Sequence, residues 1–159
     1  MQLTLVLILM LALTLPARAS EPALRVGSGV QQKDGSSTAS LVVTLFADAP
    51  EVATIRITIP PGWDVRSRSA STGALGDDSG PPGTPPSIVV WRGDVGPDAP
   101  VLIQVSLLAL PYARPGWASV DVLASDDRSN VVSDRAWVRA PGEVTKPPLR
   151  RLWLPLIRR

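Results

Sequence analysis

Apolar side chains recur at every second position along several stretches of this 159-residue chain. The clearest are residues 53–59, in which four apolar residues alternate with Thr and Arg, and residues 101–107. Successive side chains of a β-strand point to opposite faces, so a period of two is typical of a strand that is buried on one side. No stretch after the first 20 residues shows the 3.6-residue period of an amphipathic helix. The pattern therefore predicts an all-β fold.

About eight strands are expected, separated by turns rich in Gly, Pro, Asp, Asn and Ser. They cover residues 24–30, 41–46, 53–59, 63–69, 87–91, 101–108, 117–123 and 131–139. Residues 41–46 are apolar at all but one position, so both faces of this strand should be apolar, as expected for a strand at the centre of a sandwich. Residues 71–86, rich in Gly, Ser and Pro, are expected to form an exposed loop. We therefore predict an immunoglobulin-like antiparallel β-sandwich of about 7–8 strands without a disulfide.

The chain contains neither cysteine nor histidine. The lack of cysteine excludes disulfides, thiol nucleophiles and zinc–thiolate sites. The lack of histidine excludes Ser-His-Asp and Cys-His catalysis and removes the commonest metal ligand. No recognisable motif places a pair of carboxylates for glycoside hydrolysis. We therefore predict a protein that is not an enzyme and has no resident cofactor.

The two ends of the chain differ in composition from the part between them. Residues 3–15 are almost wholly apolar, and Ala17-Arg18-Ala19 is a small-x-small motif, so a signal peptide over residues 1–19 is expected. An uncleaved anchor is the alternative, although a bilayer core needs about 20 apolar residues. The sandwich domain then covers residues 20–140, and residues 141–159 form a proline-containing linker and a basic, apolar tail. This organisation predicts a secreted, extracellular or envelope-associated protein.

Charge is distributed unevenly along the chain. Residues 20–140 carry ten basic and thirteen acidic residues, whereas residues 141–159 carry five basic residues and one acidic residue. A mildly acidic body offers no extended basic face to phosphates, which argues against nucleic-acid binding. The tail places an apolar segment between arginines, which favours docking to an anionic envelope surface; adding a strand to a sheet edge is the alternative. The docking residues are Arg150, Arg151, Trp153, Arg158 and Arg159.

Four segments resemble, in the same order, motifs of the bacterial "conserved repeat" surface domain, also called domain of unknown function 11. They are Ile57–Trp63 (ITIPPGW), Val90–Pro97 (VWRGDVGP), Val101–Val105 (VLIQV) and Ala124–Asn130 (ASDDRSN). The likeness covers about residues 38–140. It implies an immunoglobulin-like sandwich in a secreted or surface protein, which acts as a spacer or adhesive module, and it carries over no catalytic residue. The family often occurs in tandem arrays, whereas this chain holds one copy.

Tryptophan supplies five of the seven aromatic residues. Trp63 and Trp91 match positions in the family pattern and are expected in the core. In the last hairpin, Trp117 and Trp137 should face outward, and a register that pairs them would build an aromatic platform able to stack on a sugar ring. The alternative is a cross-strand pair that only stabilises the sheet, or a pair covered by the tail or another domain.

Acidic residues gather around the last hairpin. Asp121, Asp126 and Asp127, with Asn130, offer the oxygen ligands that calcium prefers, although their spacing fits no EF-hand loop. The alternative is a solvated turn, because Asp and Asn are also good turn residues. The tripeptide at residues 92–94, Arg-Gly-Asp, is read by some animal adhesion receptors when a turn exposes it, but its glycine and aspartate also fit a strand-ending turn.

These observations lead to one function and one alternative. We expect a non-catalytic structural or adhesive module at the cell surface, with a protein or an envelope glycan as its partner. The alternative is a carbohydrate-binding module that uses Trp117 and Trp137.

Overall fold

The structure of the chain is a computed structural model that describes residues 24–77 and 87–142. These residues form nine strands and no helix, so nothing in the described part of the chain is a helix able to cross a membrane. The strands are β1 (Leu24–Gln31), β2 (Thr38–Ala47), β3 (Glu51–Thr58), β4 (Trp63–Ala70), β5 (Ala74–Asp77), β6 (Ile88–Val95), β7 (Val101–Ala109), β8 (Gly116–Asp126) and β9 (Val131–Ala140). The all-β prediction is confirmed.

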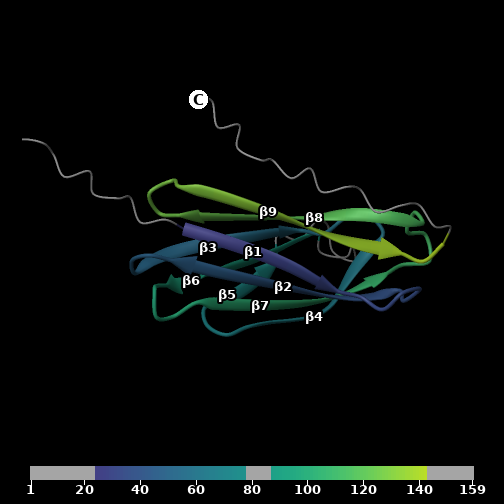
Figure 1. Cartoon of the computed structure of the whole chain (residues 1–159), viewed down its shortest axis with the longest axis horizontal. Coiled ribbons are helices and arrows are strands. Elements are labelled where there is room, and N and C mark those ends of the chain that lie inside the picture. The colour runs from purple at the N-terminus through teal and green to yellow at the C-terminus, as the bar shows by residue number, and fades with distance from the viewer. Residues whose placement is uncertain (1–23, 78–86, 143–159) are drawn as a thin grey trace, which may run out of the picture.

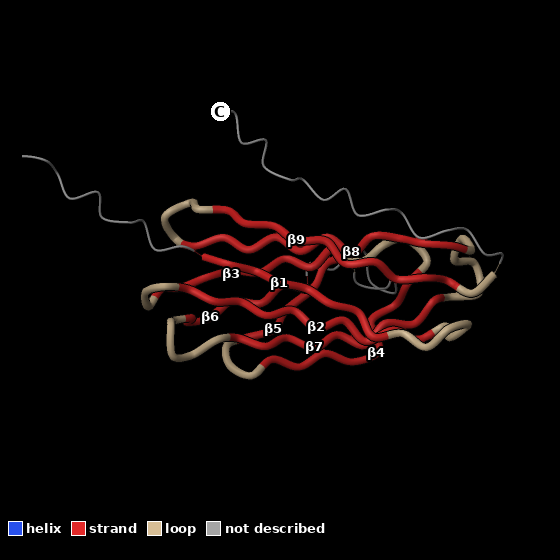
Figure 2. The backbone as a smooth tube through the Cα atoms, in the orientation of Figure 1, coloured by secondary structure: helices blue, strands red, loops and turns tan. Residues whose placement is uncertain are grey.

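Two antiparallel sheets face each other (Figures 1 and 2). The four-stranded sheet has the order β1-β2-β7-β4, and the five-stranded sheet has the order β5-β6-β3-β8-β9. The chain crosses between the sheets after β2, β3, β4, β6 and β7, which is the pattern of a sandwich rather than of a meander. The predicted immunoglobulin-like sandwich is therefore confirmed.

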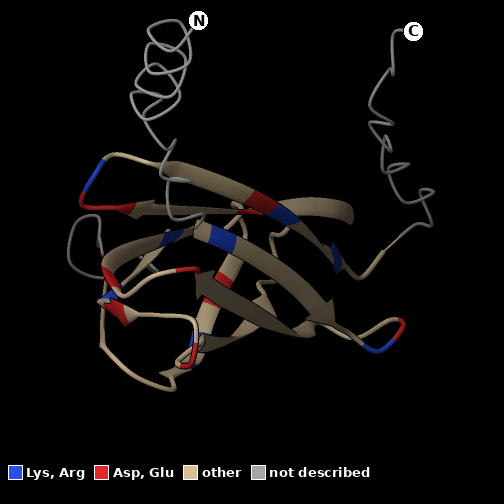
Figure 3. Ribbon diagram, turned by 60° about the vertical axis from the view of Figure 1, so that its left-hand side comes forward, with Lys and Arg blue, Asp and Glu red and all other residues tan. Residues whose placement is uncertain are grey.

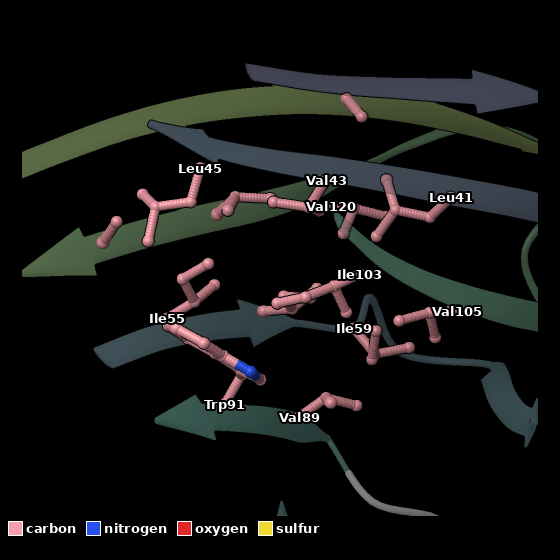
Figure 4. Close-up of a cluster of buried hydrophobic side chains, with 14 of the residues drawn as sticks. Leu41, Val43, Leu45, Ile55, Ile59, Val89, Trp91, Ile103, Val105 and Val120 are labelled. Carbon is pink, nitrogen blue, oxygen red and sulfur yellow. The ribbon is translucent and has the colours of Figure 1, made fainter. Parts of the chain in front are cut away.

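The core lies between the sheets and is built from alternate residues of the inner strands (Figure 4). From Ala53 onward in β3, and throughout β7, every second side chain is almost completely buried, as the period of two predicts. Trp91 is fully buried and Trp63 nearly so, which confirms their expected place in the core. Because burial of apolar surface is the main favourable term in folding, this layer holds the sheets together without cysteine.

Two expectations about individual segments are wrong in part. The expected loop over residues 71–86 contains β5, a four-residue edge strand that pairs with β6. Strand β2 does lie inside its sheet, between β1 and β7, but its outer side is open, and Phe46 remains 44% exposed. The apolar residues on both sides of β2 therefore do not mark a strand covered on both faces.

Polar side chains close both flanks of the sandwich. On one flank, Asp134 of β9 accepts hydrogen bonds from the backbone N–H of Ser28 in β1 (2.6 Å) and from its hydroxyl (2.7 Å). On the other flank, Arg68 of β4 forms an ion pair with Asp77 of β5. All four residues lie opposite buried positions of the neighbouring strand, so they point toward the space between the sheets. Inward-pointing polar groups of this kind protect edge strands from pairing with another chain.

Candidate functional site

Trp117 of β8 and Trp137 of β9 share the outer face of the five-stranded sheet, and both are half-buried. Trp117 lies opposite Arg139, and Trp137 lies opposite Ser119. The register that would pair the two tryptophans directly is therefore not formed, because they are offset by two residues. Such a shift keeps both rings on one face, where they are diagonal neighbours within reach of aromatic side chains.

The β8–β9 turn sets this register. The backbone N–H of Asp126 donates to the carbonyl of Asn130 (3.1 Å), which closes the turn immediately after the Ser125–Val131 pair. Ser129 adopts a positive φ of 68° inside it. Because a hairpin's register follows from its turn, this closure fixes every pair along β8 and β9, including those of the tryptophans.

A groove runs beside the two tryptophans and encloses about 160 Å³. One wall comes from the two rings and Arg139, and the other comes from the loop between β1 and β2, with the chain just after β9 completing the rim. The residues that line it are Val30, Gln32, Lys33, Asp34, Gly35, Ser36, Trp117, Trp137, Arg139, Pro141 and Gly142. The two rings therefore form a side of a concave site rather than an isolated flat platform.

Gln32 anchors the loop wall to β9. Its side-chain amide donates to the carbonyl of Arg139 (2.6 Å) and accepts from the N–H of the same residue (2.9 Å). It also donates to the carbonyl of Ser36 (2.8 Å), and the N–H of Ser36 donates to the carbonyl of Lys33 (3.0 Å). Gly35 takes a φ of +73°, a left-handed conformation that glycine adopts without strain. The Gln32 amide thus pairs with the N–H and the carbonyl of Arg139 on the edge strand β9, and it holds the loop beside the two tryptophans.

The groove combines indole surface with charges of both signs. Lys33 and Asp34 are exposed at the rim, and the half-buried Arg139 lies opposite Trp117. Aromatic surface with a few polar groups around it suits a ligand that has an apolar face and hydroxyl or amide groups at its edge. Sequence reasoning missed the contribution of the loop, because residues 31–37 show only the composition of a turn and their contact with β9 spans more than 100 residues.

The three aspartates considered for calcium engage separate partners. Asp121 forms an ion pair with Arg135, and Asp127 lies 3.8 Å from the guanidinium of Arg92. The Asp126 carboxylate accepts hydrogen bonds within its own turn, from the N–H of Arg128 (2.9 Å) and from the N–H (2.8 Å) and side-chain amide (2.6 Å) of Asn130. The described residues contain no group of three or more acidic side chains arranged to hold a metal ion. The geometry therefore favours the turn over the calcium site.

The turn changes the acidity of Asp126. Burial alone raises the pKa of this carboxyl, but the hydrogen bonds from Asn130 and Arg128 and the charge of Arg128 outweigh burial, so the net pKa is lowered. The carboxylate form is thus the one that the turn stabilises, as expected for a group that accepts several N–H bonds.

Glu51 of β3, which sequence reasoning did not single out, lies beside Asp126. Both of its carboxylate oxygens are buried without a hydrogen-bond partner in the described part of the chain. Burial raises the pKa of Glu51, the charge of Asp126 raises the pKa further, and the charge of Arg128 opposes these effects. No sequence signal marks the pair, because only the β3–β8 register brings the two residues together.

The Arg92-Gly93-Asp94 tripeptide lies within strand β6 and pairs with β3, so no turn presents it. A Cβ at Gly93 would come within 2.8 Å of both the Trp91 indole and the backbone of Gly73. The Trp91 ring is held there by a hydrogen bond from its N–H to the carbonyl of Thr72 (2.6 Å). This glycine therefore has a packing role. The expected docking residues of the tail, Arg150 to Arg159, and the expected signal peptide lie outside the described residues.

No protein-family model and no curated protein matches the chain. Among solved structures, the chain is similar to BcpA, the major pilin subunit of Bacillus cereus, with a TM-score of 0.50 and 5% identity over 75% of this chain and 40% of that chain. It is also similar to BslA, a bacterial hydrophobin, with a TM-score of 0.51 and 12% identity over 77% of this chain and 97% of that chain. The chain thus spans less than half the length of the pilin that it matches.

At such low identity, these similarities show the fold alone. They agree with an immunoglobulin-like sandwich. The finer resemblance to the "conserved repeat" domain, which rests on four short segments, is matched by no family model and stays a prediction.

Proposed function

We propose that this protein is a non-catalytic module of the cell surface or exterior with a structural or adhesive role. Three observations support the proposal. The sequence lacks the histidine and cysteine on which most nucleophilic and acid–base catalysis depends. The sandwich closes both flanks with polar side chains, as suits a protein that meets other molecules through its faces and loops. The fold is also similar to that of part of BcpA, a major pilin subunit by name.

This function depends most on export of the chain, which the apolar residues 3–15 and the Ala17-Arg18-Ala19 motif predict. The test expresses the full chain with an epitope tag in a bacterium and adds protease to intact cells and to lysed cells. A surface or exterior module is expected in the medium or in the fraction that protease removes from intact cells. A chain that stays protected until the cells are lysed, beside a cytosolic control protein, would refute the proposal.

The groove favours a second candidate, a carbohydrate-binding module. Trp117 and Trp137 offer indole surface beside a loop that carries Lys33 and Asp34, and a hexose ring has both an apolar face for stacking and hydroxyls for the charged groups. Gln32 pre-organises the loop through its three hydrogen bonds, which lowers the entropy that ordering the site on binding would cost.

Tryptophan fluorescence during titration with soluble envelope polysaccharides tests this candidate. We expect a saturable spectral shift, which the double variant Trp117→Ala/Trp137→Ala abolishes. Tyr112→Ala removes an aromatic side chain that is 70% exposed and does not line the groove, so it should leave the affinity within about twofold. If no polysaccharide shifts the spectrum, the two rings serve packing alone.

A further inference from the structure

The groove beside Trp117 and Trp137 contains a positive charge that the described part of the fold does not neutralise. Several arginines of the strands each form an ion pair with an aspartate; they are Arg25, Arg66, Arg68, Arg92 and Arg135. Within residues 24–77 and 87–142, no acidic side chain forms such a pair with Arg139, although this residue is half-buried. A charge that is partly removed from water without an opposite charge beside it costs free energy, which an anionic ligand can offset.

The backbone of Arg139 is held in a fixed place beside the rings. Arg139 follows Trp137 by two residues on β9, so both side chains lie on the outer face, and Trp117 of β8 is its direct cross-strand neighbour. The Gln32 amide accepts a hydrogen bond from the N–H of Arg139 (2.9 Å) and donates one to its carbonyl (2.6 Å), at the edge of the five-stranded sheet. Because this backbone is already ordered, a ligand that contacts Arg139 pays little entropy for ordering the site.

The loop between β1 and β2, which forms the other wall of the groove, carries one basic and one acidic residue. Lys33 and Asp34 lie next to each other at the tip of this loop, where both are exposed (Figure 3). The charged residues that line the groove are therefore two cations, Lys33 and Arg139, and one anion, Asp34. The excess is one positive charge, and the half-buried cation lies beside the indole rings. The groove is therefore complementary to a ligand that carries a negative charge next to an apolar face.

We propose that the groove binds a polysaccharide of uronic acids, whose sugar rings carry carboxylates. This inference rests on the second function proposed above, carbohydrate binding. A uronic acid ring offers an apolar face to the indole rings, and the carboxylate at its edge can accept two parallel N–H bonds from the planar guanidinium of Arg139. The ammonium of Lys33 on the opposite wall attracts the same carboxylate. A neutral sugar, in contrast, leaves Arg139 without an opposite charge.

The size of the groove favours one ring of a longer polymer. Its volume of about 160 Å³ is smaller than the ~300–1,000 Å³ of pockets that enclose a whole small-molecule ligand. Exposed residues form its rim, so the groove is open to solvent and a polymer chain can continue beyond it. Because a single ring makes few contacts, the dissociation constant should be about 0.1–1 mM, and the titration must reach that range.

Tryptophan fluorescence of the purified protein measures its binding to alginate, polygalacturonate and hyaluronate, each beside its carboxyl-reduced form. Reduction turns every carboxylate into a neutral primary alcohol and keeps the rings and their linkages. We expect at least one native polymer to bind, and its reduced form to bind at least about tenfold more weakly. Reduced polymers that bind as tightly as native ones would overturn this inference and leave carbohydrate binding intact. If no polymer binds in either form, this inference fails, and the titration with envelope polysaccharides decides carbohydrate binding separately.

Substitutions separate the charge of Arg139 from its packing. Arg139→Gln should weaken binding of the native polymer at least about tenfold and binding of the reduced form by less than about twofold. Arg135→Gln is the matched control, because Arg135 lies on the same strand and face, pairs with Asp121 and does not line the groove. It should change neither affinity by more than about twofold.

The acidic residue of the loop gives a test of opposite sign. Asp34→Asn removes the negative charge from the rim, so it should tighten binding of the native polymer by about twofold to fivefold and leave the reduced form unchanged. Equal losses in Arg139→Gln and Arg135→Gln, or an equal loss of native and reduced polymer in Arg139→Gln, would overturn the role assigned to Arg139. Weaker binding of the native polymer by Asp34→Asn would also contradict the proposal.

Discussion

At the scale of single residues, the Glu51–Asp126 pair places two carboxyl groups close together, which is electrostatically unfavourable when both are ionised. The turn stabilises Asp126 as a carboxylate, while both oxygens of the neighbouring Glu51 are buried without a hydrogen-bond partner among the described residues. Burial and the charge of Asp126 raise the pKa of Glu51 above its ordinary value of 4.5. Because the folded-state pKa is the higher one, the ionised form of Glu51 destabilises the fold. This loss of stability begins as the pH rises above 4.5, where the unfolded chain ionises, and is complete above the folded-state pKa.

Glu51→Gln should therefore stabilise the protein at neutral pH, by about 1 kcal/mol, because an amide removes the buried charge and can donate to Asp126. The gain should shrink toward zero below pH 4.5, where Glu51 is protonated in both folded and unfolded chains. Urea unfolding at pH 7 and pH 4 measures both values. Asp98→Asn, at an exposed acid in a turn, is the control and should change little at either pH. A destabilised Glu51→Gln protein at pH 7 would contradict the argument.

Gly93 is a second residue whose role is set by its surroundings. Gly93→Ala should cost about 1–3 kcal/mol of unfolding free energy, because the added Cβ comes within 2.8 Å of the buried Trp91 ring and the Gly73 backbone. Gly76→Ala, on the adjacent strand β5, is the matched control, since its Cβ would meet nothing within 4 Å. Thermal unfolding followed by tryptophan fluorescence compares the two. Equal stability of the two variants would show that the side chains around Trp91 can shift to accommodate the added methyl group without a loss of stability.

At the scale of elements, polar groups on the two flanks of the sandwich keep its edge strands from pairing with another chain. Asp134→Ala removes the acceptor for both hydrogen-bond donors of Ser28, so β1 loses these two hydrogen bonds to β9. We expect a loss of about 1 kcal/mol in stability and faster aggregation on warming, because two edges then stand open. Light scattering during a temperature ramp and urea unfolding measure these effects. Asp98→Ala serves as the control. If Asp134→Ala aggregates at the same rate as this control, the polar contact on this flank does not protect the edge strands.

The elements also show how far sequence patterns reach. A period of two predicted β3 and β7, because both strands lie inside a sheet with one face on the core. Strand β5 was not predicted, because its four residues form an edge strand whose position depends on pairing with β6 rather than on an apolar period of its own. The shared face of Trp117 and Trp137 followed from parity, but their register depends on the Asp126 turn, and the groove depends on a loop more than 80 residues away in sequence.

At the scale of the whole molecule, the two outer faces and the tail divide the proposed roles. The groove lies where the outer face of the five-stranded sheet meets the loop after β1, so most of the outer face of the four-stranded sheet takes no part in it. The structural and adhesive roles proposed for the chain therefore do not compete for the same surface.

The last prediction separates folding from retention at the surface. The sandwich completes its pairing at the Gly116–Ala140 pair, and the buried core contains no residue beyond Ala140 among those described. A chain that ends at Gly142 should thus unfold cooperatively with a free energy within about 0.5 kcal/mol of the full chain. If the arginines of the tail hold the protein to an anionic envelope, the shortened chain should move from the envelope fraction to the medium, and about 0.5 M salt should release the full chain in the same way. Fractionation with immunoblotting measures the distribution, and an unchanged distribution with intact folding would remove the tail from the retention mechanism.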